Sequence, residues 1–139
     1  MELQTIEYNT KGGKRTIRPE LVNCDGVYNV PIYEGEEMIG RAILTRHIRN
    51  INGSFHFEDA IVLMDIYIYK EEHRRQGAAD DLMEFITHAF KKIMTGTSTK
   101  EGRELCYKWG FKMEIINKTK YLIYKKEGAD AVQKSEPKA

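Results

Sequence analysis

The stretch that decides the fold runs from Ile61 to Ile86 and reads IVLMDIYIYKEEHRRQGAADDLMEFI. Its first part is rich in β-branched and aromatic residues, which favours a strand, and its last part repeats apolar residues at helical spacing. Between them lie a short charged turn and the run Arg74–Ala79, RRQGAA. A strand that leads through small residues into a helix N-terminus directs unpaired N–H groups and the positive end of the helix dipole at one place. We therefore predict an anion-binding turn here.

The composition predicts one ordinary globular domain. The chain has 139 residues, a hydrophobic content of 41% and a net charge of +1, which argues against a dedicated nucleic-acid-binding protein. Cys24 and Cys106 have neither metal-ligand spacing nor a disulfide framework, so we expect a reducing compartment and no metal. The sequence shows no signal peptide and no membrane-spanning run. We expect a cytoplasmic domain over residues 1–126 and a disordered tail over residues 127–139.

Apolar alternation and glycine or asparagine turns predict most other elements as strands. The expected strands are residues 3–9, 15–22, 28–33, 38–48, 60–69, 92–97, 111–116 and 120–125. Pro19 makes the second of these an edge strand at best. A helix is expected from Gly77 to about Lys92, and Ser98–Glu101 fits a capping box for a second helix that ends at Gly110. This order predicts a mixed α/β (α+β) domain, with a mostly antiparallel sheet that is parallel near its middle.

The run Arg74–Ala79 does not fit two common phosphate-binding folds. It contains no Gly-Lys-Ser/Thr, and the hairpins before it do not resemble the first strand of a βαβ series. If these six residues are considered without their context, the alternative is a tight turn whose only role is to let the helix pack closely on the strand.

In its context, the run resembles motif A of the GNAT superfamily, the acyl-CoA-dependent N-acyltransferases, whose pattern is Gln/Arg-x-x-Gly-x-Gly/Ala. Gly77 and Ala79 satisfy both small positions. The strand end Tyr67–Tyr69, the helix end Glu104–Phe111 and the final hairpin follow in the family's order, so the resemblance covers about residues 28–125. It implies a GNAT-like fold and acetyl-CoA as the acyl donor.

The resemblance also implies where the cofactor lies. In this family the strand before motif A splays from its neighbour and leaves backbone groups free for the pantetheine arm. Backbone N–H groups of residues 75–80 would hold the pyrophosphate, with Arg74 and Arg75 adding positive charge. Thr99 stands where many members place a cofactor-contacting Asn. A solvated turn is the alternative for the arginines, and a helix cap for Thr99. The predicted cofactor-binding residues are Tyr67, Ile68, Tyr69, Arg74, Arg75, Gln76, Gly77, Ala78, Ala79, Asp80 and Thr99.

The implied chemistry is direct transfer, in which a neutral amine attacks the thioester and the CoA thiolate leaves. A strand N–H near Ile68 or Tyr69 could stabilise the oxyanion. Asp65 is the first candidate for the base, because a lone carboxyl in an apolar run would be buried, and burial favours its proton-binding form. An Asp that bonds within the sheet or faces solvent is the alternative. Weaker candidates for the base are Glu58, Asp59 and His56. We expect His73 to lie at the surface and not to be catalytic.

The general-acid position departs from the family. Four residues before Gly110, where many members have a Tyr that protonates the leaving thiolate, this chain has Cys106. A thiol could donate that proton, although an ordinary packed cysteine is the alternative. Tyr107 could substitute if the helix is rotated. The predicted catalytic residues are therefore Asp65, Cys106 and Tyr107.

The acceptor side departs as well. Family members usually have two helices between the first and second strands, whereas residues 10–26 carry little helical pattern. We expect an open face that suits a macromolecular amine or one completed by a partner subunit, and an exposed sheet edge would permit a homodimer. The competing hypotheses are a GNAT-like acyl-CoA-binding module without catalysis and a small acyltransferase that modifies nucleic-acid bases. The last would use the limited basic surface of Arg41, Arg46, His47 and Arg49.

Overall fold

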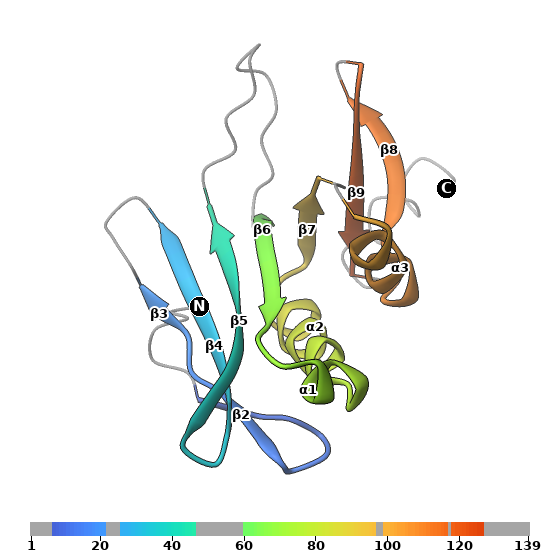
Figure 1. Ribbon diagram of the computed structural model, residues 1–139. Coiled ribbons are helices and arrows are strands. Elements are labelled where there is room, and N and C mark those ends of the chain that lie inside the picture. Colours follow the sequence, from blue (N-terminus) through green and yellow to red (C-terminus); the bar gives the residue numbers. More distant parts are fainter. Residues whose placement is uncertain (1–6, 22–25, 47–59, 97–98, 117, 127–139) are drawn as a thin grey trace, which may run out of the picture.

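The computed structural model describes residues 7–21, 26–46, 60–96, 99–116 and 118–126, whose strands form a single sheet. The strands are β1 (Tyr8–Asn9), β2 (Arg15–Ile17), β3 (Glu20–Leu21), β4 (Val27–Glu34), β5 (Glu37–Thr45), β6 (Ala60–Ile68), β7 (Lys92–Thr95), β8 (Lys112–Ile116) and β9 (Thr119–Lys125). They lie in the order β1-β2-β4-β5-β6-β7-β9-β8, with β3 beside β4 (Figure 1). Among these described strands, the β6–β7 pair is parallel and the others are antiparallel, so the predicted mixed sheet is confirmed.

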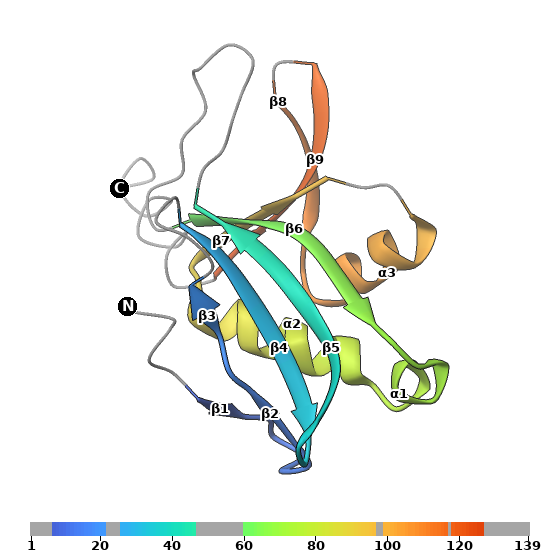
Figure 2. The ribbon, with the colours of Figure 1, turned by 60° about the vertical axis from the view of Figure 1, so that its left-hand side comes forward.

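Within the described ranges, three helices accompany the sheet: α1 (Glu71–Arg75), α2 (Ala78–Ala89) and α3 (Lys100–Lys108). α2 lies along one face of the sheet (Figure 2) and buries Leu82, Met83, Phe85 and Ile86 against it. Burial of each such side chain stabilises the fold by about 1.5–3 kcal/mol. The apolar spacing that predicts this helix is therefore the spacing of its packed face.

The ends of α3 are set by local hydrogen bonds. At its start, the Thr99 hydroxyl accepts a hydrogen bond from the Gly102 N–H at 3.0 Å. At its end, Gly110 has a φ of 90°, and the N–H groups of Gly110 and Phe111 donate to the carbonyls of Tyr107 and Cys106. This pair of bonds is a Schellman motif, which needs glycine at the left-handed position. The predicted stop at Gly110 is confirmed.

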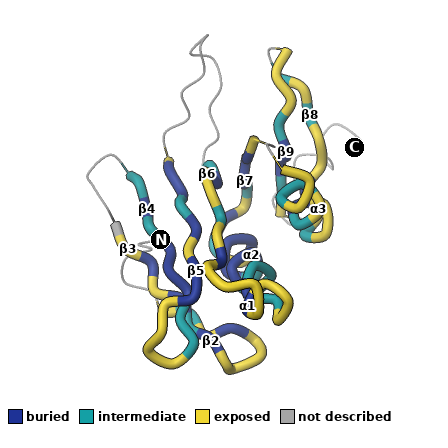
Figure 3. Tube along the Cα trace, in the orientation of Figure 1, coloured by how far each residue is buried: buried dark blue, intermediate teal, exposed yellow. Residues whose placement is uncertain are grey.

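A single core holds the helices and the sheet together. Sheet residues such as Val30 and Leu44 share one buried cluster with α2 and with Cys106 of α3. Figure 3 shows the buried positions gathered in β4, β5 and α2, while α3 and β8 are mostly exposed or half-buried.

Three local features differ from the predictions. The charged turn forms the helix α1, because acidic residues in its first turn and basic ones in its last suit the helix dipole, and Glu71 pairs with Arg75 at 3.0 Å. The expected strand at 15–22 is divided before Pro19 into β2 and β3, and β2 lies inside the sheet, between β1 and β4. The cap of α3 is Thr99, as the alternative role of this residue predicts, and not Ser98, with which the predicted capping box begins.

Some predictions fall on residues outside the described ranges. These are the tail at 127–139, the basic positions His47 and Arg49, and the base candidates His56, Glu58 and Asp59. Across the part of the chain that the structure does describe, no helix combines the length and the apolar character needed to cross a membrane.

Candidate cofactor and catalytic site

β6 and β7 are paired only where they begin. Ala60, Ile61 and Val62 pair with residues 92–94. One residue further, the Thr95 hydroxyl donates to the Leu63 carbonyl at 2.8 Å. Beyond this point the two strands diverge toward α1 and α3 (Figure 2). The edge of β6 that faces β7 is therefore free of ladder partners among the described residues from Met64 onward.

A β-bulge lies where the strands separate. The register of β5 with β6 shifts between Ile43 and Leu44, which leaves Met64 as an extra residue of β6. Met64 and Asp65 are exposed in succession, whereas Leu63 and Ile68 face the core. A bulge bends its strand and increases the local twist. This bend explains why β6 leaves β7 here.

The hydrogen bonds of β6 identify which backbone groups point to the open edge. The Tyr69 N–H donates to the Ile39 carbonyl of β5 at 3.0 Å, so it is already engaged. Because bonding direction alternates along an antiparallel strand, the backbone of Tyr67 also bonds to β5, and the N–H of Ile68 points away from it. Of the two oxyanion donors predicted, Ile68 is the one on the open edge.

Three N–H groups precede the hydrogen-bonded ladder of α2. Gly77 has a φ of 83°, and the N–H groups of Gln76 and Gly77 bond back to carbonyls of α1. The first bond of α2 runs from the Asp81 N–H to the Gly77 carbonyl at 3.0 Å. The N–H groups of residues 78–80 therefore lie at the helix start with no intrahelical acceptor, as anion-binding helix termini do.

Charged side chains around this turn have distinct partners. Arg74 donates from Nε to the Ile68 carbonyl at 2.8 Å, and its guanidinium lies 5.5 Å from the centre of the Tyr67 ring. Arg75 is exposed and paired with Glu71, as the solvated alternative predicts. Asp80 accepts from Lys108 Nζ at 3.0 Å and from Trp109 Nε1 at 2.8 Å. The Asp80 carboxylate is thus neutralised by Lys108 and ties α2 to α3.

The structure separates the two candidates for the general acid. Cys106 is 5% exposed in the core cluster, and burial raises the pKa of its thiol to about 11. A thiol this reluctant to ionise is a poor proton donor to another thiolate, and the packed alternative describes it. Tyr107 is 47% exposed on the surface of α3. An exposed phenol at this place remains available for proton transfer.

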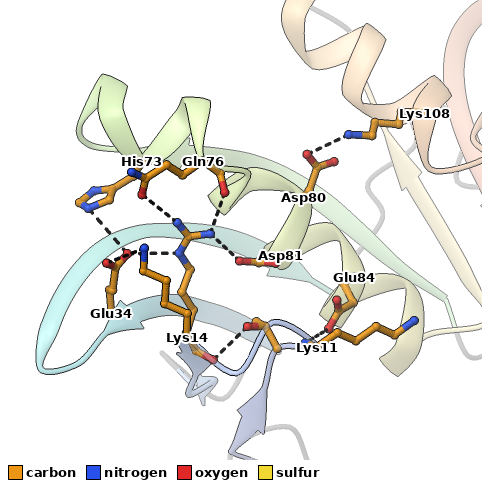
Figure 4. Close-up of polar contacts among 11 residues, drawn as sticks. Lys11, Lys14, Glu34, His73, Gln76, Asp80, Asp81, Glu84 and Lys108 are labelled. Atoms are coloured by element: carbon orange, nitrogen blue, oxygen red, sulfur yellow. Dashed lines mark hydrogen bonds and ion pairs between the residues drawn. The ribbon is translucent and has the colours of Figure 1, made fainter.

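Two burial predictions are wrong. Asp65 is exposed, because it shares with Tyr67 the face of β6 that points away from the core. The burial that was expected of this base is therefore absent. Asp65 lies next to Met64, the extra residue of the bulge. His73, expected at the surface, is buried, with Nε2 3.8 Å from the Glu34 carboxylate (Figure 4).

Substitutions of Thr99 test its two predicted roles, the cap of α3 and a contact with the cofactor. Thr99→Ala should lower the free energy of unfolding by about 1 kcal/mol, because the cap of α3 is lost, whereas Thr99→Ser should preserve it. Urea unfolding measures both. A weaker affinity for CoA in Thr99→Ala than in Thr99→Ser, measured where both variants are folded, would indicate that Thr99 also makes the predicted contact with the cofactor. Equal unfolding free energies in the two variants would contradict the capping role.

Gly40 allows β5 and β6 to approach closely. A Cβ at this position would lie 2.6 Å from both the Tyr67 carbonyl oxygen and Ile68 Cδ1. Since backbone cannot yield cheaply, Gly40→Ala should cost about 1–3 kcal/mol of unfolding free energy. Gly12→Ala is the matched control, because nothing lies within 4 Å of its Cβ. An equal loss in both variants would show that the close approach is unimportant.

The chain is similar in fold to solved structures of other proteins. Neither a scan against family models nor a search of curated proteins gave a match. PaiA N-acetyltransferase from Thermoplasma acidophilum, in complex with coenzyme A, has a TM-score of 0.52 at 15% identity, covering 72% of this chain and 61% of that one. RimL, a ribosomal α-N-protein acetyltransferase in complex with coenzyme A, has a TM-score of 0.52 at 14% identity, covering 73% and 63%.

A third similar structure is the KacTA–DNA complex, with a TM-score of 0.56 at 14% identity, covering 81% of this chain and 76% of that one. The chain spans less than two thirds of the length of PaiA and of RimL. Identities this low show a shared fold, which agrees with the sheet order and the divergence of β6 from β7.

Proposed function

We propose that this chain, which has the GNAT fold, is an N-acetyltransferase that moves an acetyl group from acetyl-CoA to an amine. The observation that carries the proposal is the free edge of β6 that ends beside the start of α2. That edge offers backbone groups to an extended amide-containing chain, and the N–H groups of residues 78–80 offer themselves to a diphosphate. Acyl-CoA is a substrate that has both parts.

The charges near the turn fit a CoA diphosphate. Asp80 and Asp81 lie in the first turn of α2 and could repel a phosphate, but Asp80 is paired with Lys108 and Asp81 with Arg15. Arg74 lies at the junction of β6 and α1 with its Nε bonded to the strand, which leaves its remaining N–H groups for a phosphate oxygen. The pantetheine arm would then run along β6 from this junction toward the bulge.

The proposed chemistry is direct transfer. The neutral amine attacks the thioester carbonyl and forms the C–N bond, and the charge that develops on the oxygen is stabilised by the Ile68 N–H. Asp65, exposed beside the bulge, accepts the amine proton directly or through a water molecule. When the C–S bond breaks, Tyr107 donates its phenolic proton to the thiolate. The products are the acetylated amine and CoA.

The acceptor is proposed to be an amine on a macromolecule. Along the described residues between β2 and β4 the chain forms the short strand β3 and no helix. The PaiA and RimL structures are longer than this chain, so part of their length has no counterpart in it. An acceptor side built from few elements suits a large substrate that brings its own contact surface.

Thermal unfolding with and without acetyl-CoA tests the first step of the proposal. A ligand that binds the native state at 100 times its Kd stabilises the protein by about 2.7 kcal/mol, so saturating acetyl-CoA should raise Tm by several degrees. Pantetheine without the nucleotide should give a smaller shift, because it leaves the helix N-terminus unused. An unchanged Tm at saturating acetyl-CoA would reject the proposal.

A second candidate function is an acyl-CoA-binding module without catalysis. It is favoured by Cys106, which occupies the expected acid position and is buried in the core. A Tm increase with acetyl-CoA, without CoA release in the presence of a broad panel of amines and amine-bearing macromolecules, would favour this module. Release of CoA that depends on an amine would favour the enzyme.

A further inference from the structure

A buried arginine lies beneath the turn that precedes α2. Arg15, on β2, is only 5% exposed. Its Nη1 donates to the Gln76 carbonyl at 3.1 Å and to Asp81 Oδ2 at 2.7 Å, and its Nε donates to Glu34 Oε2 at 3.3 Å. Gln76, Asp81 and Glu34 thus converge on one guanidinium, and Figure 4 shows these three labelled residues around a shared centre. A planar group with fixed donors holds three elements at once: the end of β4, the turn and the first helical residues of α2.

The contacts fall on both sides of the left-handed residue. Gln76 immediately precedes Gly77, and Asp81 is the residue whose N–H begins the ladder of α2. A second contact, from Nη2 to Gln76 Oε1 at 3.4 Å, adds to the same side. Arg15 therefore ties down the two ends of the segment that carries the N–H groups of residues 78–80. Its bonds go to the carbonyl and side chain of Gln76 and to the Asp81 carboxylate, and leave the N–H groups of residues 78–80 unoccupied.

The same guanidinium compensates charge. Asp81 lies in the first turn of α2, so its carboxylate would compete with a bound phosphate for the positive helix end if it were unpaired. Desolvation alone would raise the pKa of Glu34, but the hydrogen bond from Arg15 and the charge of Lys14 outweigh it and lower that pKa. Lys14 and His73 also approach the Glu34 carboxylate, at 3.4 and 3.8 Å. Removal of Arg15 would leave Asp81 without this partner.

We infer that Arg15 is a positioning residue for the CoA diphosphate: it fixes the Gln76–Asp81 turn and neutralises Asp81 from the side opposite the ligand. This inference rests on the proposed function for the identity of the ligand. The part-buried pair of Arg15 and Asp81 joins this turn to a hairpin that is distant in sequence. The effect should be confined to the diphosphate half of the substrate.

The test compares Arg15→Gln with Arg18→Gln. Arg18 lies three residues further along, is about half exposed, and pairs with Glu7 in solvent, so the control removes the same charge without touching the turn. Affinity for CoA, for adenosine 3′-phosphate 5′-diphosphate (the nucleotide part of CoA) and for pantetheine is measured by calorimetry at a temperature where all variants are folded. We expect Arg15→Gln to weaken the binding of CoA and of this nucleotide at least about tenfold, which corresponds to about 1.4 kcal/mol, and to leave the binding of pantetheine unchanged.

Two further variants keep the test informative if Arg15→Gln does not fold. Arg15→Lys retains the charge but cannot make the same set of bonds, so its affinity for adenosine 3′-phosphate 5′-diphosphate should be intermediate. Arg15→Gln combined with Asp81→Asn removes the charge imbalance and should recover part of the lost affinity. Equal weakening of the binding of pantetheine and of adenosine 3′-phosphate 5′-diphosphate, or no weakening in either Arg15 variant, would overturn the inference.

Amide hydrogen exchange separates this inference from the proposed function. Exchange at Gln76, Gly77 and Asp81, whose N–H groups are hydrogen-bonded, should be faster in the Arg15 variants than in the wild type or in Arg18→Gln, because the turn has lost its support. If the wild type does not bind CoA, the proposed function fails and this measurement alone decides on Arg15. Unchanged exchange would then overturn its role in fixing the turn, and faster exchange would retain it.

Discussion

Replacing Tyr107 by Phe is expected to lower kcat by about 100-fold or more, the contribution that a positioned proton donor usually makes. The thiolate would then leave without its proton donor, while the affinity for acetyl-CoA should change little, because the hydroxyl is lost from an exposed residue. Release of CoA, followed with a thiol reagent under saturating acetyl-CoA and acceptor, measures kcat. A Tyr107→Phe variant with wild-type kcat would remove Tyr107 from the mechanism.

Cys106 supplies the matched comparison. Its thiol is buried and its pKa is raised to about 11, so Cys106→Ala should retain kcat and lose only packing. Removal of this small buried group should cost about 1 kcal/mol of unfolding free energy. The opposite pattern, with kcat lost in Cys106→Ala and kept in Tyr107→Phe, would assign the acid to the position that the family resemblance indicates.

Replacing Asp65 by Asn should also lower kcat by about 100-fold, because the amide cannot accept the proton of the attacking amine. The affinity for acetyl-CoA should be unchanged, since the side chain of Asp65 lies on a face of β6 and the cofactor is proposed to use its backbone edge. The loss should be partly relieved at high pH, where more of the acceptor is already the free amine. Unchanged kcat at neutral pH would exclude Asp65 as the base.

Glu20 provides the control for Asp65. It pairs with Asn29, which pairs with Ile43, which pairs with Asp65, so both carboxylates lie in one row across the same face of the sheet. Glu20→Gln removes an equal charge from this face at a position three strands away. A loss of kcat in Glu20→Gln equal to that in Asp65→Asn would indicate a general effect of charge on acceptor binding.

Most of the sheet could be predicted because its hairpins are local. Apolar alternation on both sides of a glycine or asparagine turn defines β4–β5 and β8–β9, and the capped helix that ends at Gly110 depends on residues within one turn of each end. The divergence of β6 and β7 was expected only from the family resemblance. No spacing in the sequence indicates the extra residue at Met64.

The predictions that failed concern which face of a strand or helix is buried in the folded domain. The run around Asp65 is apolar on both sides, so the sequence cannot distinguish a carboxyl in the core from one on the open face. The contacts of Arg15 could not be predicted from the sequence, because its partners Gln76 and Asp81 are 61 and 66 residues away. In α1, the acidic start and basic end were a signal that could have identified the helix.

The contacts of the N-terminal strands have a consequence for the order of folding. β2 can pair with β4 once residue 34 is available, but Arg15 must wait for residues 76–81, and the Tyr8 hydroxyl must wait for Glu84, to which it donates at 2.6 Å. During synthesis, chains emerge from the N-terminus, and contacts of long sequence separation carry the larger entropy cost of loop closure. The strands that are made first are therefore fixed in place only when α2 closes over the sheet.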